Sequence, residues 1–329
     1  MFGKLRAARI LAASAALMFG TLAASAQTPG LGTYPDRPVT LMHGFAAGGN
    51  SDTISRVIGD PLSQRLGQPV IVEARAGAGG NIAADRLAKS APDGYSLITF
   101  TGGHAVSGAI YKSLPFDTVN DFQMVSMLIY FPFVIAVNKD SPYKTLSDLI
   151  AAAKAKPNTI NYSSAGVGST QHLAGALFCS MAGIEMIHIP YRGGTGPIND
   201  LLGGSVDVLV DTQTVTLPHI ASGAIRGLGV TSPAEWPTLK GIPPVGNIVK
   251  GYDVRSWMGI AAPKGLPAPI LEKLNTEIRY VAGRDPAKGK FEQLGNEVRA
   301  SSPQEMHDWV ANEVAKWRKV VADAKIPQQ

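Results

Sequence analysis

The chain has 329 residues, of which 45% are apolar and 17% charged, and a net charge of +5. This length is sufficient for two lobes with separate cores, and the modest charge gives no reason to expect a nucleic acid or a membrane surface as a partner. A single cysteine, Cys179, excludes an internal disulfide, and we interpret it as a small core residue on a helix face.

The first 26 residues have the pattern of a secretory signal peptide. Lys4, Arg6 and Arg9 precede an apolar run over residues 10–24, and small residues suit cleavage after Ala26. A membrane anchor is the alternative, but this run has about fifteen residues and a spanning helix needs roughly twenty. Without the three basic residues of the leader, the mature chain has a net charge of +2, three less than the full chain. The sequence therefore predicts an exported protein, most simply one of a bacterial periplasm.

A strand, a glycine loop and a helix start follow one another at residues 39–52. Residues 39–42 are apolar and predict a buried strand, and residues 44–49 read Gly-Phe-Ala-Ala-Gly-Gly. Asn50, Ser51 and Asp52 then all suit a helix N-cap. Free backbone N–H groups converge at such a loop, and the positive end of the helix dipole faces it. The loop therefore predicts an anion site.

Neither glycine cluster in the first hundred residues matches a nucleotide motif. Gly44 to Ser51 has the spacing of a P-loop, but Asn50 occupies the position of the phosphate-binding lysine. A second cluster at residues 77–80 also follows an apolar strand. Ile82, however, replaces the third small residue of a dinucleotide fingerprint, and no acidic residue ends the next strand. We therefore expect no nucleotide and no cofactor.

Strands and helices alternate along the mature chain, which predicts parallel sheets with crossover helices. The first series has expected strands at residues 39–42, 70–73 and 96–101 and helices at 52–66 and 82–89. A β-branched run at residues 133–137 then leaves this lobe, and an alanine-rich helix follows from Thr145 to just before Pro157. The second series has expected strands at residues 160–163, 186–189, 206–210 and 227–230 and helices at 171–181, 197–202 and 215–222.

The remaining chain is expected to return to the first lobe. Residues 257–261 predict a strand, and helices are expected at 267–281 and 286–294. A last helix begins at the capping box formed by Ser302 and Glu305, with Pro303 at its first position.

A second loop rich in glycine and hydroxyl groups, at residues 163–170, precedes the helix at 171–181. It repeats the motif of residues 44–52 in the second series of strands. Two such loops, one in each lobe, can face each other across a cleft, so the sequence predicts an anion held between two lobes.

Eight short motifs occur in one order along the mature chain. They are YPDRP at 34–38, FAAGG-x-x-D at 45–52, RAGAGGN at 75–81, DGY at 93–95, QHLAG at 171–175, PYRG at 190–193, DLLGG-x-VD at 200–207 and LPHI at 217–220. Together they resemble the Bug-type receptors, the periplasmic substrate-binding proteins of tripartite tricarboxylate transporters. The resemblance covers essentially the whole mature chain.

The resemblance implies an α/β, two-lobed type II periplasmic binding fold, a clamshell with two crossover strands as its hinge. Residues 33–131 and 256–329 are expected to form lobe 1, and residues 132–255 lobe 2. In that family, backbone amides and ordered waters typically hold a small carboxylate. Carried onto this sequence, the implied ligand-binding residues are Phe45, Ala46, Ala47, Gly48, Gly49, Asp52, Thr101, Gly102, His104, Ser164, Gly168, Ser169, Thr170, Gln171, Arg192 and Asp211.

Several of these residues have structural alternatives. Asp52 either caps the helix that follows it or orients water bound to the ligand. His104 and His172 each lie beside a glycine loop and are either ligand contacts or structural residues. Arg192 either reaches the far carboxylate of a diacid or is solvated or bridges the lobes. Asp211 ends an apolar strand and accepts hydrogen bonds from a hydroxyl, ammonium or water, but not from an ionised acid.

Two features depart from the family pattern. The first loop usually opens with proline, whereas here Gly44 follows His43, which gives a looser or roomier loop. The stretch at residues 130–133 reads Tyr-Phe-Pro-Phe and is unusually aromatic for the first crossover. One hypothesis is that these rings line the distal pocket and favour an aromatic or long apolar carboxylate, and the other is that they only pack the hinge.

We expect a monomeric receptor, not an enzyme, that delivers a mono- or dicarboxylate to a membrane permease. A periplasmic sensor subunit for a signalling protein is the alternative. A secreted hydrolase using Ser169, His172 and Asp211 is a further one, but the chain lacks Gly-x-Ser-x-Gly at the second loop. It also lacks His-Glu-x-x-His, and its six histidines have no metal-ligand spacing, so no metal is expected.

Overall fold

A computed structural model describes residues 34–329 of the chain. The predicted signal peptide and its cleavage after Ala26 lie outside these residues. In the described part, no helix is both long and apolar enough to cross a bilayer.

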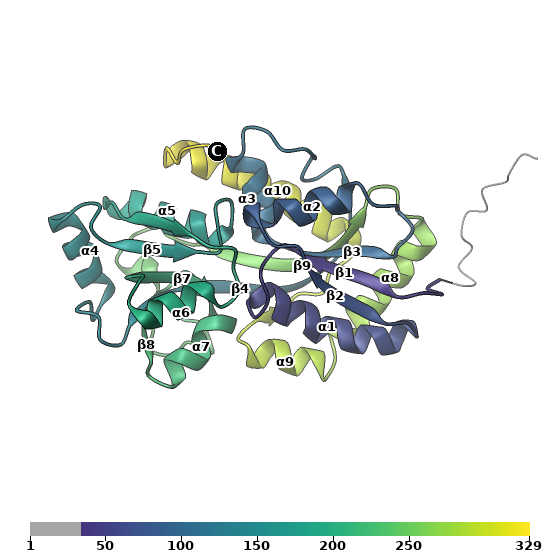
Figure 1. The fold of residues 1–329 in the computed structure, drawn as a ribbon, viewed down its shortest axis with the longest axis horizontal. Helices are drawn as coiled ribbons and strands as arrows, with labels where there is room; N and C mark the ends of the chain where they lie inside the picture. Colours follow the sequence, from purple (N-terminus) through teal and green to yellow (C-terminus); the bar gives the residue numbers. More distant parts are fainter. Residues whose placement is uncertain (1–33) are drawn as a thin grey trace, which may run out of the picture.

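One continuous curled sheet runs through both ends of the molecule (Figure 1). Its strand order is β2-β1-β3-β9-β4-β7-β5-β6, and β8 and β10 pair with β4 in addition. The strands are β1 (Val39–His43), β2 (Val70–Ala74), β3 (Ser96–Thr101), β4 (Phe122–Asn138), β5 (Asn161–Ser164), β6 (Ile187–Pro190), β7 (Val208–Thr212), β8 (Ile225–Val230), β9 (Arg255–Pro263) and β10 (Glu297–Val298).

The long strand β4 joins the two ends of this sheet. Its residues 122–132 pair antiparallel with β9, and its residues 133–138 pair with β7 and β8 instead. The change of partners falls between Pro132 and Phe133. Strand β9 in turn pairs with β3, so β4 and β9 are the two crossover strands that the sequence predicted.

Helices cover both faces of the sheet, as parallel strands with crossover connections require. They are α1 (Asn50–Leu66), α2 (Asn81–Ala88), α3 (Gly102–Ile110), α4 (Leu146–Ala155), α5 (Thr170–Ala182), α6 (Gly196–Gly203), α7 (Gln213–Ala221), α8 (Ala268–Ala282), α9 (Ala287–Gln293) and α10 (Pro303–Asp323). We call β1–β3, β10, α1–α3 and α8–α10 the first lobe, and β5–β8 and α4–α7 the second lobe.

Most expected elements agree with the structure to within two residues, whereas α3, β10 and the first half of β4 were not expected. The expected helix over residues 52–66 begins two residues earlier, because Gly49 and not one of the three polar residues after it is the N-cap. Helix α3 was not expected, since its sequence GGHAVSGAI begins with two glycines. The first half of β4 was also missed, because residues 122–129 are buried on both faces and show no alternation.

The last helix, α10, closes the first lobe. Its capping box forms as predicted, with Ser302 and Glu305 bonding reciprocally. Val310, Val314 and Trp317 are buried on the face that lies against α3 and β4. Cys179 is half-buried on α5, and burial raises the pKa of its thiol to about 12, so the thiol is protonated at neutral pH.

The lobes also touch at a second place, beside the segment that joins α9 to β10. The carbonyl of Gly295, between α9 and β10, accepts hydrogen bonds from Trp236 Nε1 at 2.7 Å and from Gln213 Nε2. A solvent-open cavity of about 900 Å³ lies beside this contact, between residues 232–238 and 292–297. Gln213 is the first residue of α7, so this contact reaches directly to the end of β7.

Candidate functional site

Four helices begin around one pocket between the lobes. Helices α1 and α3 come from the first lobe and α5 and α7 from the second, and each starts directly after a strand or its loop. The first-turn amides of a helix have no acceptor inside the helix, and together they give its N-terminus about half a positive charge. Thr101 and Ser169 cap α3 and α5, whereas α1 and α7 have no side-chain cap. One first-turn amide in α3 and one in α5 are therefore satisfied by a cap, and no side chain caps α1 or α7.

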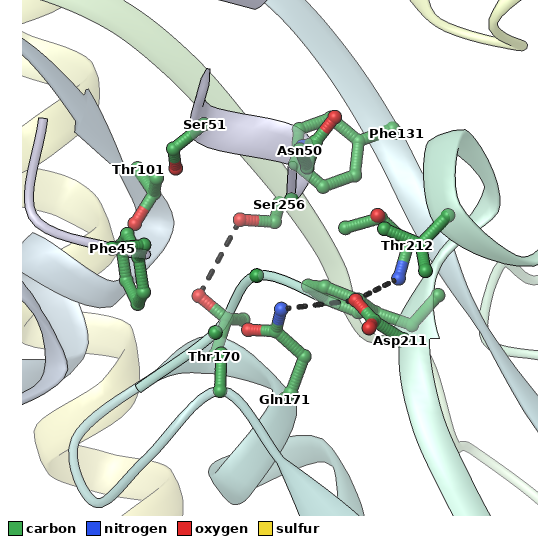
Figure 2. A pocket seen from close by; sticks show the side chains of 16 residues that line it. Phe45, Asn50, Ser51, Thr101, Phe131, Thr170, Gln171, Asp211, Thr212 and Ser256 are labelled. Atoms are coloured by element: carbon green, nitrogen blue, oxygen red, sulfur yellow. Dashed lines mark hydrogen bonds between the residues drawn. The ribbon is translucent and has the colours of Figure 1, made fainter. Parts of the chain in front are cut away.

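The pocket encloses about 440 Å³ of empty space with its open mouth included. Figure 2 shows Phe45, Ser51 and Thr101 on one side and Gln171, Asp211 and Thr212 on the other. Asp211 is the only charged residue in the lining. The lining residues are Phe45, Gly49, Asn50, Ser51, Thr101, Phe131, Phe133, Ala165, Thr170, Gln171, Gly193, Gly194, Asp211, Thr212, Val215 and Ser256.

The two lobes touch directly at the edge of this pocket. The amide of Ala46 donates to the carbonyl of Arg192 at 2.8 Å, and Ala46 forms a parallel bridge with Gly193. Tyr111 at the end of α3 donates its hydroxyl to the carbonyl of Val167 at 3.3 Å. Thr170 and Ser256 face each other with their hydroxyl oxygens 3.4 Å apart. These contacts hold the lobes together in a closed arrangement.

The closed arrangement depends on glycines that let backbones approach. A Cβ atom on Gly49 would lie 2.9 Å from the amide nitrogen of Gly194 in the other lobe. A Cβ on Gly79 would lie 2.5 Å from the carbonyl oxygen of Val167, again across the lobes. Any side chain at these two positions would push the lobes apart.

Asp52 fixes the shape of the first loop. Its carboxylate accepts a hydrogen bond from the amide of Gly48 at 3.0 Å and from Arg56 Nε at 3.0 Å. Burial raises the pKa of this carboxyl, but the bonds from Gly48 and Arg56 outweigh it, so the pKa is below its ordinary value. His43 Nε2 lies 3.4 Å from the same carboxylate, and burial lowers the pKa of this histidine. Asp52 therefore holds the loop through Gly48, at the start of α1.

Asp211 lies at the end of β7 and faces the pocket. One of its oxygens accepts from the amide of Thr212 at 2.7 Å and from Gln171 Nε2 at 3.5 Å (Figure 2). Burial raises the pKa of this carboxyl to about 6, in spite of the hydrogen bonds from Thr212 and Gln171. The hydroxyl of Thr212 is buried and has no partner among the described residues.

The structure brings part of the predicted set together. Phe45, Gly49, Thr101, Thr170, Gln171 and Asp211 line the pocket. Ala46, Ala47 and Gly48 belong to the loop at its edge, and Gly102 begins α3 beside Ser256. Ser164, Gly168 and Ser169 shape the second loop: Ser164 accepts from the amide of Gly166 at 3.0 Å, and Ser169 caps α5.

Two predicted residues lie apart from this lining. His104 stacks on Phe100 with ring centroids 3.7 Å apart, and its Nε2 contacts the carbonyl of Thr118 at 2.7 Å. Burial lowers the pKa of His104 to about 4, so the ring is neutral at pH 7. Arg192 has an exposed side chain, and its contribution at the site is the carbonyl that accepts from Ala46.

The residues of the hydrolase alternative do not form a triad. Ser169 donates its hydroxyl to the carbonyl of Gly166 at 2.7 Å, and His172 stacks on His188 with centroids 4.2 Å apart. Asp211 bonds to Gln171 and Thr212 and not to His172. In residues 34–329, no group of three His, Cys, Asp or Glu side chains is placed to hold a metal ion.

Several lining residues were not in the predicted set, and most had a readable signal. Asn50 and Ser51 were noted only as cap candidates. Gly193 ends the PYRG motif, and Gly194 follows it directly. Ser256, on β9, and Val215, on α7, reach the pocket through tertiary packing that the sequence pattern does not reveal. Phe131 and Phe133 both line the pocket, as one of the two hypotheses for residues 130–133 required.

A model of the family described as "Tripartite tricarboxylate transporter family receptor" matches residues 54–326. The chain belongs to this receptor family. Protein BugT of Bordetella pertussis is 33% identical over 294 residues, which cover 88% of this chain and 90% of BugT. A protein from the tcbD-tcbE intergenic region of Pseudomonas sp. (strain P51) is 33% identical over 320 residues, covering 97% of this chain and 95% of that protein.

Several solved structures share the fold. The R. palustris protein Rpa4515 with adipate is 36% identical with a TM-score of 0.86, over 90% of this chain and 100% of that one. The periplasmic binding protein BugD is 32% identical, also with a TM-score of 0.86 and the same coverage. MatC from Rhodopseudomonas palustris with bound malate is 30% identical with a TM-score of 0.83, over 88% of this chain and 100% of MatC. The two-lobed type II binding fold is therefore confirmed.

Proposed function

We propose that this receptor captures a small organic carboxylate between its lobes and delivers it to the membrane permease of a tripartite tricarboxylate transporter. Two of its structural relatives hold carboxylates, adipate and malate. The protein works as an exported monomer after cleavage behind Ala26. Lobe 1 comprises residues 33–131 and 256–329, and lobe 2 comprises residues 132–255.

The observation that carries this proposal is a pocket at four helix N-termini whose lining has no basic side chain. Backbone amides then replace the arginine or lysine that would otherwise neutralise an anion. A hydrogen bond from an amide to a charged carboxylate contributes roughly 1.5–3 kcal/mol. Three or four such bonds are sufficient for tight binding without an ion pair.

The receptor binds and releases its ligand without changing it chemically. The ligand binds the open protein, β4 and β9 bend as hinges, and the lobes close through contacts such as Ala46 with Arg192. The permease then recognises the surface that closure creates. A strain lacking the receptor is expected to lose uptake of the ligand, as a transport role requires and a sensor role does not.

A thermal-shift screen tests the ligand class. The chain from Gln27 is purified, unfolded and refolded to remove bound ligand, and then mixed with carboxylates, sugars and nucleotides. A ligand at a hundred times its Kd adds about 2.7 kcal/mol to the free energy of unfolding, which raises the melting temperature by several degrees. Stabilisation by carboxylates alone supports the proposal, and stabilisation by sugars or nucleotides alone contradicts it.

The aromatic rings of Phe131 and Phe133, which line the pocket, favour a carboxylate with an aromatic or long apolar body. Phe131 and Phe133 are both buried on β4, with ring centroids 5.8 Å apart at an angle of 80°. Phe131→Leu keeps the apolar volume but removes the ring. Because aromatic pairs contribute roughly 0.5–1.5 kcal/mol beyond their area, the variant should weaken phenylacetate about 3- to 10-fold more than hexanoate. Calorimetric titration of both ligands measures the difference.

Phe178→Leu is the matched control for this variant. Phe178 is fully buried in α5 against Tyr252 and does not line the pocket. It should lower the melting temperature without changing the ratio of the two affinities. If Phe131→Leu leaves this ratio unchanged as well, the rings only pack the hinge.

A further inference from the structure

The pocket has two chemically different ends. Ser51 and Thr101 lie on one side in Figure 2, at the starts of α1 and α3, where amides and hydroxyls donate. Asp211 and Gln171 lie on the other side. The second end also holds the start of α7, but its one charged side chain is the carboxylate of Asp211, which no basic residue of the lining neutralises.

The hydrogen bonds of Asp211 involve only one of its two carboxylate oxygens. Asp211 accepts from two donors among the described residues, the Thr212 amide and Gln171 Nε2, and both bond to the same oxygen, Oδ1. Its second oxygen accepts no hydrogen bond from the described residues and borders the pocket. Because Gln171 turns its amide nitrogen toward Asp211, its amide oxygen is also left to accept. A buried carboxylate without partners is costly, so a ligand that donates to it gains the most.

The charges around the pocket also favour a ligand with a single carboxylate. Four helix N-termini, each equivalent to roughly half a charge, supply about two positive charges to the pocket. The carboxylate of Asp211 offsets one of them, which leaves about one for the ligand. A dicarboxylate would bring two negative charges and place one of them against Asp211. A monocarboxylate whose far end donates hydrogen bonds brings no second negative charge against Asp211 and satisfies the acceptors.

Resting on the proposed function, we infer that Asp211 selects carboxylates that carry a hydroxyl or ammonium group at the end opposite the bound carboxylate. Asp211, helped by Gln171, accepts the hydrogen bond from that group. Plain diacids of the same length are rejected, because their second carboxylate would face the carboxylate of Asp211.

The experiment compares ligands that differ only in their far end. Adipate, ε-hydroxycaproate, ε-aminocaproate and caproate share one chain length, and succinate, γ-hydroxybutyrate, γ-aminobutyrate and butyrate share a shorter one. Calorimetric titration at pH 7.5 should rank the hydroxyl or ammonium member above the diacid in at least one series, by about tenfold. Tenfold corresponds to about 1.4 kcal/mol, near the lower limit for a hydrogen bond to a charged group.

Asp211→Asn tests the assignment to this residue. The amide has the same shape but can donate, so the variant should bind the hydroxyl or ammonium ligand about tenfold more weakly and the diacid more tightly. Asp140→Asn is the matched control. Asp140 is exposed just after β4, so this substitution removes the same charge outside the pocket. This control should keep the wild-type ranking.

The outcomes separate the inference from the function on which it rests. If the wild type binds the diacids at least as well as their hydroxyl and ammonium analogues, Asp211 does not select the ligand, although a carboxylate receptor remains. If no member of either series binds, together with the other carboxylates of the thermal screen, the proposed function itself is wrong. The wild-type ranking decides the inference even if Asp211→Asn does not fold.

Discussion

Replacing Gly49 with alanine should lower ligand affinity by about 5- to 150-fold while leaving the fold intact. The φ angle of Gly49 is −87°, which alanine adopts freely, so the substitution does not strain the backbone of α1. Its Cβ atom, however, would lie 2.9 Å from the amide nitrogen of Gly194 and 3.1 Å from its Cα in the opposite lobe. Over-packing of this kind costs about 1–3 kcal/mol, and here the cost falls only on the closed state.

Calorimetric titration and a melting curve of the Gly49→Ala variant measure the two effects separately. Gly203→Ala is the matched control, because Gly203 lies in α6 with nothing within 4 Å of the added carbon. It should keep its affinity and melt at the same or a slightly higher temperature. Wild-type affinity in Gly49→Ala would show that ligand binding does not need the Gly49–Gly194 contact.

Replacing Asp52 with alanine should lower the free energy of unfolding by about 1–2 kcal/mol and weaken ligand binding as well. The side chain of Asp52 is only 10% exposed, and its loss leaves the amide of Gly48 without an acceptor. A hydrogen bond to a charged group contributes about 1.5–3 kcal/mol, and the loss should lie near the lower limit because Gly48 is exposed and water can replace the carboxylate. The ion pair with Arg56 adds little, because the arginine side chain is 59% exposed and screened by solvent.

The effect of Asp52 should depend on pH. The pKa of its carboxyl in the folded protein is below the ordinary value of 3.8, so ionised Asp52 stabilises the fold. This stabilisation is complete above about pH 4 and is lost as the pH falls through the folded pKa. Urea unfolding of wild type and Asp52→Ala should therefore give a difference that shrinks on acidification.

Asp52→Asn is the control for the loop itself, since its amide oxygen still accepts from Gly48. It should lose less stability than the alanine variant, and its stability should lack the acid dependence that belongs to the carboxylate. Equal losses in both variants would mean that the charge of Asp52, and not its bond to Gly48, stabilises the loop.

Local signals in the sequence were sufficient to predict most helices and strands of the fold. The helix start at Ser302 is encoded by a capping box, and the loops at 44–49 and 163–170 by glycines between apolar strands. The first half of β4 was missed, because a strand buried on both faces gives no alternation. Helix α3 was missed because Gly102 and Gly103 have low helix propensity, yet Thr101 caps it and tertiary packing stabilises it.

The site was harder to predict than the fold. Phe45, Gly49 and Thr170 lie in loops whose motifs are visible, and Asp211 ends a recognisable strand. Ser256 reaches the pocket only because β9 crosses between the lobes, and Gly194 only because the lobes close on each other. His104 was placed near the cleft by its neighbours in sequence, but its ring packs on Phe100 in the first lobe. Contacts between lobes depend on three-dimensional arrangement, which no local pattern contains.

A crystal structure of the mature protein with the carboxylate that stabilises it most tests the central claim most directly. The carboxylate should lie between the lobes, with its oxygens about 2.7–3.2 Å from backbone nitrogens in the first turns of α1 and α3. The far end of the ligand should contact Asp211. A carboxylate paired with the Arg192 side chain, or a ligand in the cavity beside Trp236, would contradict it.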